Sequence, residues 1–476
     1  MRSPAHYALG SNTSVQLFGL LCLAVVVAAV HRGEMFLVAI PAAALAVPLL
    51  LFSPNAIVWA FFLSFFWGRF LLERFLIGVV ATDIALLVFL AAYGTRFWFA
   101  PRAVPFVRPH PRIFRPLVAL CAWAAFSCCV NIYRYDSVQA VVSLWLLLKC
   151  AQLVVLFWIS ADALSDIRPR HVGNAVILLG ILQLPITWWQ QAFAGSGSYL
   201  ESRVFVTGTF TYHHSMLGTV MLIPMAFCLW RILEARRAAA RLGFGALCVA
   251  FLWVIVASGT RSALVGLPVA GIVWIVMEFR RRPRQVAFVA GLGVCASLMV
   301  AFSSLGDRFV ASLTVGQAGI VDVSALSRLY IWEGAVAHFA KMNLWQKLVG
   351  VGIGAYFTIP YEFVLWAGLR HGVGAHNNVL HVLLETGIVG LAIFVWFFFE
   401  VLRELHRRSR TSPMAFAYFY LTIALLGSGL AQETFWFQKA FGALWLLYVF
   451  LLAVVLRDGG GRELDPRKPA APGGAG

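Results

Sequence analysis

Residues 371–390 read HGVGAHNNVLHVLLETGIVG, and they join a glycine-spaced polar turn to the start of an apolar segment. The apolar character continues through LAIFVWFFF at 391–399, so the segment is long enough for a membrane-spanning helix of about 20 residues. The histidine and the two amides at 376–378 therefore lie at the mouth of a predicted membrane span. This position predicts a polar site at the surface of a membrane protein.

The composition of the whole chain supports a membrane protein. Of its 476 residues, 61% are hydrophobic and 12% are charged, whereas soluble domains are nearer half apolar and a quarter charged. Apolar runs can be read as about fourteen helices, which predicts an all-α polytopic integral membrane protein. The predicted helices centre near Leu21, Ala44, Phe61, Leu86, Ala124, Leu147, Leu182, Leu222, Phe251, Pro268, Gly293, Ile393, Thr422 and Leu446. The first is expected to be a retained span, because it lacks the basic front and the cleavage site of a signal peptide.

The predicted spans divide the chain into four regions. Residues 1–302 are expected to hold about eleven transmembrane helices and residues 377–456 about three more. Between them, residues 303–376 form a large loop that is expected to be folded, because SRLYIWEGAVAHFAKM at 327–342 has a helical period. The Gly/Pro-rich tail at 457–476 is expected to be disordered.

Arginines gather in alternate loops, and this pattern predicts the orientation. Clusters occur at 96–112, 236–241, 280–284 and 403–410, and the tail adds more basic residues. The positive-inside rule makes these loops and both termini cytoplasmic, which places residues 303–376 on the opposite side. The same pattern accounts for most of the net charge of +17, so the high charge does not indicate nucleic-acid binding.

All eight cysteines fall inside apolar runs. This distribution disfavours both a disulfide framework and a cysteine–zinc site, and it favours cysteines as small packing residues.

Three arginines lie on the extracytoplasmic side, where the positive-inside rule does not favour them. They are Arg203, Arg261 and Arg328, and Arg261 occupies a tight turn between two spans. Because a guanidinium fork matches phosphate oxygens, the three predict an anion site. The alternative for each is an arginine that faces solvent or a lipid headgroup.

Ionisable residues within predicted spans form a second group of candidates. Asp83 and Lys149 are expected to be functional or paired, and the sequence leaves their partners open. Glu385 lies more than two turns from His376, so a direct hydrogen bond is not expected, and it is predicted to face an arginine within the bundle.

Two patterns have structural interpretations. His371, His376 and His381 are spaced by five residues, which does not place them on one helical face and disfavours a zinc site. The glycines of GVGIG at 350–354 follow no strand of a βαβ unit, so they predict a tight turn rather than a dinucleotide fingerprint.

Three segments together resemble the O-antigen ligase and polymerase superfamily of bacterial envelopes. They are ASGTRSALVGL at 257–267, SRLYIWEGAVAHFAKMNLWQKLVGVGIGAYF at 327–357 and AHNNVLHVLLETGIVGLAIF at 375–394. In that family an S-G-S/T-R-x-A turn precedes a long periplasmic loop, which closes on H-N-x-x-L-x-x-x-x-E-x-G. The resemblance is close over residues 258–394 and extends weakly upstream to Arg203 and GTFTYHHSMLG. One departure is Tyr212-His213-His214, where members often have a small residue or Pro-Asn.

The resemblance implies a glycosyltransferase-C-like bundle in the bacterial inner membrane, with its active site on the periplasmic side. It implies transfer of a glycan from undecaprenyl diphosphate to a sugar hydroxyl with inversion, without a metal or a cofactor. The acceptor is a growing lipid-linked chain in a polymerase or lipid A–core in a ligase. Span count and length favour the polymerase of O-antigen or exopolysaccharide, for which a chain-length regulator is a candidate partner. The alternative of another class is a flippase or transporter of the same lipid, which the one-sided polar signal disfavours.

The residue types agree with this chemistry. Histidine can take the proton of a sugar hydroxyl near neutral pH, so His376 is predicted to be the general base. Arg203, Arg261 and Arg328 are predicted to stabilise the departing diphosphate. Asn377 or its neighbour is predicted to cap the following helix, and Glu385 is predicted to support the site. The alternative for His376 is a histidine that packs the end of the loop.

Overall fold

The computed structural model describes residues 54–66, 70–74, 77–99, 108–164, 167–193, 198–200, 203–210, 214–278, 323–355, 374–432, 434–436 and 441–458, with scattered positions between 283 and 298. The chain divides into two compact units, Met1–Phe61 with Leu87–Pro101, and Phe62–Leu86 with Arg102–Gly476. In the first unit, Phe61 stacks on Phe89 with ring centroids 5.2 Å apart.

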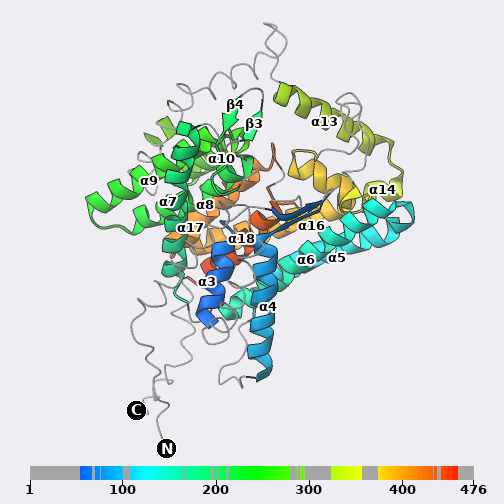
Figure 1. The fold of residues 1–476 in the computed structure, drawn as a ribbon, viewed down its shortest axis with the longest axis horizontal. Coiled ribbons are helices and arrows are strands. Elements are labelled where there is room, and N and C mark those ends of the chain that lie inside the picture. Colours follow the sequence, from blue (N-terminus) through cyan, green and yellow to red (C-terminus); the bar gives the residue numbers. More distant parts are fainter. Residues whose placement is uncertain are drawn as a thin grey trace, which may run out of the picture. The chain divides into compact units, whose positions relative to one another are not determined.

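Helices form most of the described chain (Figure 1). They are α3 (Pro54–Ser64), α4 (Ala81–Phe99), α5 (Pro111–Asn131), the 3-10 helix η1 (Ile132–Arg134), α6 (Ser137–Ala163), α7 (Pro169–Phe193), α8 (His214–Glu234), α9 (Ala238–Ala257), α10 (Arg261–Glu278), α13 (Val323–Lys341), α14 (Leu344–Val349), α16 (Asn378–Ser409), α17 (Pro413–Ser428) and α18 (Phe441–Val455). Local sequence explains several of the starts. Asp136 caps α6 by accepting a hydrogen bond from the Gln139 N–H at 2.7 Å, and proline opens α5 and α17.

Seven described helices are long and apolar enough to cross a membrane, judged by length and composition: α5 with η1, α6, α7, α8, α9, α10 and α16. The chain is therefore a helical polytopic membrane protein. Every predicted helix centre except Leu21, Ala44 and Gly293 falls inside a described helix. Leu21 and Ala44 lie outside the described residues, and Gly293 is one of the scattered positions. The predicted total of about fourteen spans stays a prediction.

Two short antiparallel hairpins differ from the all-α prediction. β1 (Phe70–Arg74) pairs with β2 (Ile77–Val80), and β3 (Ser198–Leu200) pairs with β4 (Arg203–Phe205). Apolar runs this short cannot be assigned to a strand or a helix by periodicity, which is why the sequence did not reveal them.

The predicted loop at 303–376 is described over 323–355 and 374–376. α13 covers the segment in which a helical period was predicted, and α14 follows it closely. The predicted tail is described only at Arg457 and Asp458, which form a turn, and residues 459–476 lie outside the described part.

The core of the second unit is built on α17 and α18. All of α18 from Gly442 onward is buried, and it packs against α6, α7 and α17. The Tyr418 hydroxyl donates to the Tyr448 carbonyl at 2.5 Å, and the hydroxyls of Thr422 and Tyr448 lie 3.0 Å apart. These bonds satisfy polar groups that would otherwise be costly inside an apolar bundle.

A buried ion pair answers the open question of Asp83 and Lys149. The two side chains, at the start of α4 and the middle of α6, form a salt bridge, and their exposed fractions are 2% and 3%. The Lys149 ammonium also lies 4.9 Å from the ring centroid of Trp145. Burying both charges together is what makes either one tolerable at this depth.

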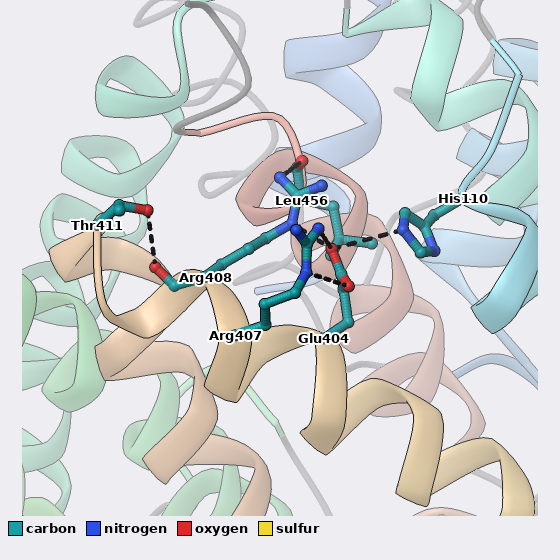
Figure 2. Close-up of polar contacts among 6 residues, drawn as sticks. All are labelled: His110, Glu404, Arg407, Arg408, Thr411 and Leu456. Atoms are coloured by element: carbon teal, nitrogen blue, oxygen red, sulfur yellow. Dashed lines mark hydrogen bonds and ion pairs between the residues drawn. The ribbon is translucent and has the colours of Figure 1, made fainter. Parts of the chain in front are cut away.

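The C-terminal end of α16 carries a cluster of ion pairs (Figure 2). The Glu404 carboxylate is buried and accepts from Arg407 Nη2 at 2.7 Å and from Arg408 Nε at 2.6 Å, while His110 Nε2 lies 3.4 Å away. Arg408 also donates to the carbonyl of Leu456, just after α18. We call these five residues the anchored end.

Candidate functional site

The turn before α10 is held rigidly. The hydroxyls of Ser258 and Thr260 lie 2.7 Å apart, and Thr260 donates to the carbonyl of His214 at the start of α8 at 3.1 Å. Gly259 between them has φ +67°, a conformation that favours glycine. Arg261 is the first residue of α10, so its backbone is fixed by this turn.

Packing places Arg261 and His376 at the same end of the second unit. Gly266 of α10 lies against the last turn of α17 near Ser428, so α10 begins where α17 ends. Just beyond α17, the carbonyl of Leu430 accepts a hydrogen bond from Nδ2 of Asn377 at 3.0 Å. The start of α10 and the start of α16 therefore meet around the same loop.

The start of α16 is capped as predicted. The Asn377 side chain accepts from the N–H groups two and three residues ahead, at 2.9 and 3.2 Å. The neighbouring Asn378 side chain instead donates to Thr434 at 3.0 Å and accepts from the Phe435 N–H at 3.2 Å. One asparagine caps the helix and the other ties it to the loop after α17.

His376 has an unusual backbone conformation. Its φ is +48°, and among the described residues it is the non-glycine residue with positive φ. Such a conformation costs about 1–2 kcal/mol. The residue before His376 is fixed by a hydrogen bond, because the Trp332 indole of α13 donates to the Ala375 carbonyl at 2.8 Å. Arg328 lies one turn before Trp332 on the same side of α13.

Glu385 lies fully buried two turns into α16. Its carboxylate accepts from the Gly354 N–H at 2.8 Å and from the Trp436 indole at 2.6 Å, and it lies 3.2 Å from His381 Nε2. The structure thus pairs Glu385 with two loops and a histidine, not with the predicted arginine. Sequence reasoning missed Trp436, for which the only signal was an indole in a short polar connection between two apolar helices.

A break in α16 next to Glu385 receives the glycine turn. Gly387 has φ +70° and ψ −173° inside the helix, so preceding carbonyls lose their helical partners. The Leu384 carbonyl accepts from the Val351 N–H at 3.0 Å, and the Glu385 carbonyl accepts from the Gly352 N–H at 2.9 Å. The Thr386 carbonyl accepts from the Trp123 indole at 2.8 Å. We call the segments 350–355, 376–387 and 434–436 the loop-built end.

The tight turn predicted for the glycines at 350–354 is confirmed, because all three glycines have positive φ. At Gly350 a side chain would also clash with the backbone of Glu385 and Thr386. Glycine is therefore needed for the close approach of this turn to α16.

Arg203 begins β4, and its backbone alone is described. The neighbouring segment is well defined: Gln190 Oε1 accepts from the N–H groups of Thr207 and Gly208 at 2.9 and 2.8 Å. Tyr212 and His213, which belong to the segment that differs from the family pattern, lie outside the described residues. The diphosphate role of Arg203 stays a prediction, as do the roles of Arg261 and Arg328.

Within the described ranges, no group of three or more histidine, cysteine, aspartate or glutamate side chains could hold a metal ion. The loop-built end holds buried hydrogen-bond donors and the imidazoles of His376 and His381 at the start of a helix long and apolar enough to cross a membrane. These features define the class of an integral membrane protein with a polar site at one end of its helices.

A family model described as O-antigen ligase matches residues 246–395. This match includes Arg261, Arg328, His376, Asn377 and Glu385. It confirms the resemblance to the O-antigen ligase superfamily.

Three curated proteins of Rickettsia are similar to part of the chain. One from Rickettsia conorii, named "Putative polysaccharide ligase RC0486", is 22% identical over 228 residues, which are 44% of this chain and 50% of that protein. Similarly named proteins of Rickettsia bellii and Rickettsia typhi are 23% and 24% identical over 44% of this chain and 51% of their own length. The chain spans about half the length of the curated relatives it matches.

Proposed function

We propose that the chain is a glycosyltransferase that moves a glycan from undecaprenyl diphosphate to a sugar hydroxyl. The observation that carries the proposal is that contacts link the three segments that hold the family motifs. α13 is bonded to the residue before His376, and the starts of α10 and α16 both lie by the end of α17. The remaining parts of the proposal are a glycosyltransferase-C-like bundle of about fourteen spans in the bacterial inner membrane, with this end facing the periplasm.

In the proposed reaction, His376 takes the proton of the acceptor hydroxyl. The hydroxyl oxygen forms the new bond to the anomeric carbon from the face opposite the diphosphate, so the configuration inverts. The bond from that carbon to the diphosphate oxygen breaks, and the diphosphate leaves with the electron pair. Arg203, Arg261 and Arg328 stabilise its developing charge, which is the work a metal ion does elsewhere.

The acceptor separates two versions of this function. The predicted count of about fourteen spans favours a polymerase, which extends a lipid-linked glycan. The description of the matching family model and the names of the Rickettsia relatives favour a ligase, which transfers to lipid A–core. The chemistry at the donor is the same in both versions.

Purified protein in lipid vesicles tests the proposal. It is mixed with an undecaprenyl-diphosphate oligosaccharide and either a second lipid-linked oligosaccharide or lipid A–core, and the product is read by gel shift. Product with the first acceptor supports the polymerase and product with the second supports the ligase. Movement of the donor between leaflets without product in either reaction would instead identify a flippase and overturn the proposal.

Orientation is tested separately by cysteine labelling. Glu333 is exposed on α13, and Arg410 is exposed just beyond α16 at the opposite end. In spheroplasts of cells, an impermeant maleimide should label Glu333→Cys directly and Arg410→Cys only after permeabilisation. The reverse pattern would place the loop-built end in the cytoplasm.

A further inference from the structure

The glycine turn lies deep beside the spans and not above them. A side chain at Gly387 would clash with the backbone of Leu348 and Gly350, so these segments touch. Gly387 is nine residues after Asn378, or about 13 Å along α16 from its first residue. The end of α14 and the turn after it therefore lie well below the start of a membrane-spanning helix.

Contacts with a second helix, α6, also place the glycine turn beside a span. The Ser143 hydroxyl of α6 donates to the Ile353 carbonyl at 2.6 Å, two turns into that helix. A side chain at Gly354 would meet Val142 and Leu146 of the same helix. The turn thus descends beside α6 as well as α16.

The polar backbone of the turn is satisfied by the last residue of α5, by the connection between α5 and α6, and by α16. The carbonyls of Gly350 and Val351 accept from Asn131 Nδ2 at 3.2 Å and from the Tyr135 hydroxyl at 3.0 Å. The N–H groups of this turn donate to carbonyls of α16 and to Glu385, as described above. Irregular backbone is tolerated at membrane depth only where protein or a water-filled cavity satisfies it, so these contacts meet the requirement of a bilayer-embedded turn.

α14, whose last residues reach this depth, presents an apolar face outward. Leu344, Trp345 and Leu348 are 75%, 51% and 37% exposed, and their spacing places them in one sector of the helix. Exposed Ile132, which begins η1 directly after α5, and exposed Ile388 on α16 belong to the candidate spans that α14 and its turn pack against. In water these side chains would be unfavourable, whereas in lipid they would continue the lipid-facing surface of the spans.

We propose that residues 344–355 form a re-entrant segment in the membrane leaflet at the loop-built end, with Leu344, Trp345 and Leu348 against lipid acyl chains. The partner of this surface is the bilayer itself. This inference does not depend on glycosyl transfer, because it rests on the contacts with α5, α6 and α16.

Collision of a spin label with two paramagnetic relaxation agents, oxygen and a nickel chelate, tests the proposal. Leu344→Cys, Trp345→Cys and Leu348→Cys are each labelled with a nitroxide and reconstituted in lipid vesicles, with Glu333→Cys on α13 as the water-facing control. A Cys129→Ala background removes an exposed native thiol, and the same background without an added cysteine gives the remaining signal. Oxygen concentrates in lipid, whereas a nickel chelate stays in water.

The expected result is a ratio of oxygen to nickel collisions several-fold higher at 344, 345 and 348 than at 333. Nickel collisions equal to those at 333 would place α14 in water and overturn the proposal. Low collision with both reagents would show that protein covers this face, which would also overturn it.

Discussion

The two ends of α16 each hold a buried glutamate, and the two glutamates are satisfied in different ways. At the anchored end, Glu404 takes two guanidinium groups from its own helix and lies beside His110 (Figure 2). At the loop-built end, Glu385 takes a backbone N–H from one loop and an indole from another. The first arrangement neutralises charge locally, whereas the second draws separate segments together. Glu385, which binds two separate loops, is suited to assembling a site. Glu404, which binds two arginines of the same helix, is suited to fixing a helix end.

The largest expected effect is at His376. His376→Asn removes the proposed base, while asparagine tolerates the positive φ at this position better than alanine does. Transfer in the gel-shift assay should fall by about 10² to 10⁴. The matched variant at the anchored end, His110→Asn, should transfer at the wild-type rate. If His376→Asn keeps more than about a third of the rate, far above what loss of a base allows, the assignment is wrong.

Arg261→Lys should give the second-largest loss of transfer rate. Lysine keeps the charge but cannot offer the bidentate fork to a diphosphate. Loss of one charge-assisted contact of about 1.5–3 kcal/mol corresponds to a roughly 10- to 150-fold lower rate. Arg407→Lys at the anchored end is the control and should change transfer little. Equal rates for both variants at equal expression would remove Arg261 from the diphosphate site.

Glu385→Gln should lower stability more than it changes chemistry directly. The carboxamide keeps one acceptor and turns an N–H₂ group toward a site where both loops donate. An unsatisfied pair of buried donors costs about 1–3 kcal/mol, which thermal unfolding in detergent should detect as a lower melting temperature. Trp436→Phe removes one of these donors together with part of a fully buried ring, so it should also lower the melting temperature. A glutamine variant as stable as wild type would show that Glu385 does not hold the loops.

The smallest expected effect is the pH response of the anchored end. Burial lowers the pKa of His110 and the neighbouring arginines lower it further, while Glu404 opposes the shift. Because the unfolded chain then binds more protons below its ordinary pKa near 6.5, this contribution to stability is complete above that pH and is lost as the pH falls. In His110→Asn the melting temperature should therefore decline less steeply below pH 6.5 than in wild type. Parallel curves for the two proteins would exclude this role.

Features that depend on neighbours in the sequence could be predicted. The long apolar runs placed the helix centres, and the position of Asn377 before an apolar run predicted its cap. The glycine spacing predicted a turn, and the motifs predicted the family.

Features that depend on distant residues could not be predicted. Asp83 and Lys149 are 66 residues apart, and nothing local in the sequence selects one ionisable residue as the partner of another. Glu385 meets Trp436 and Gly354 only because two loops fold over the break at Gly387. The depth of α14 also escaped prediction, because a six-residue helix gives no span signal of about 20 residues.

The burial of α18 has a consequence for how the protein is made. This helix is buried along its length and packs against α6, α7 and α17, which all precede it in the chain, and it is the last described helix to leave the ribosome. Earlier spans must therefore be inserted before the helix that fills their centre exists. We expect them to stay loosely associated, within reach of the insertion machinery, until α18 enters and closes the packing. Substitutions in the middle of α18, such as Tyr448→Ala, should then delay assembly of the whole unit and expose the nascent protein to membrane proteases.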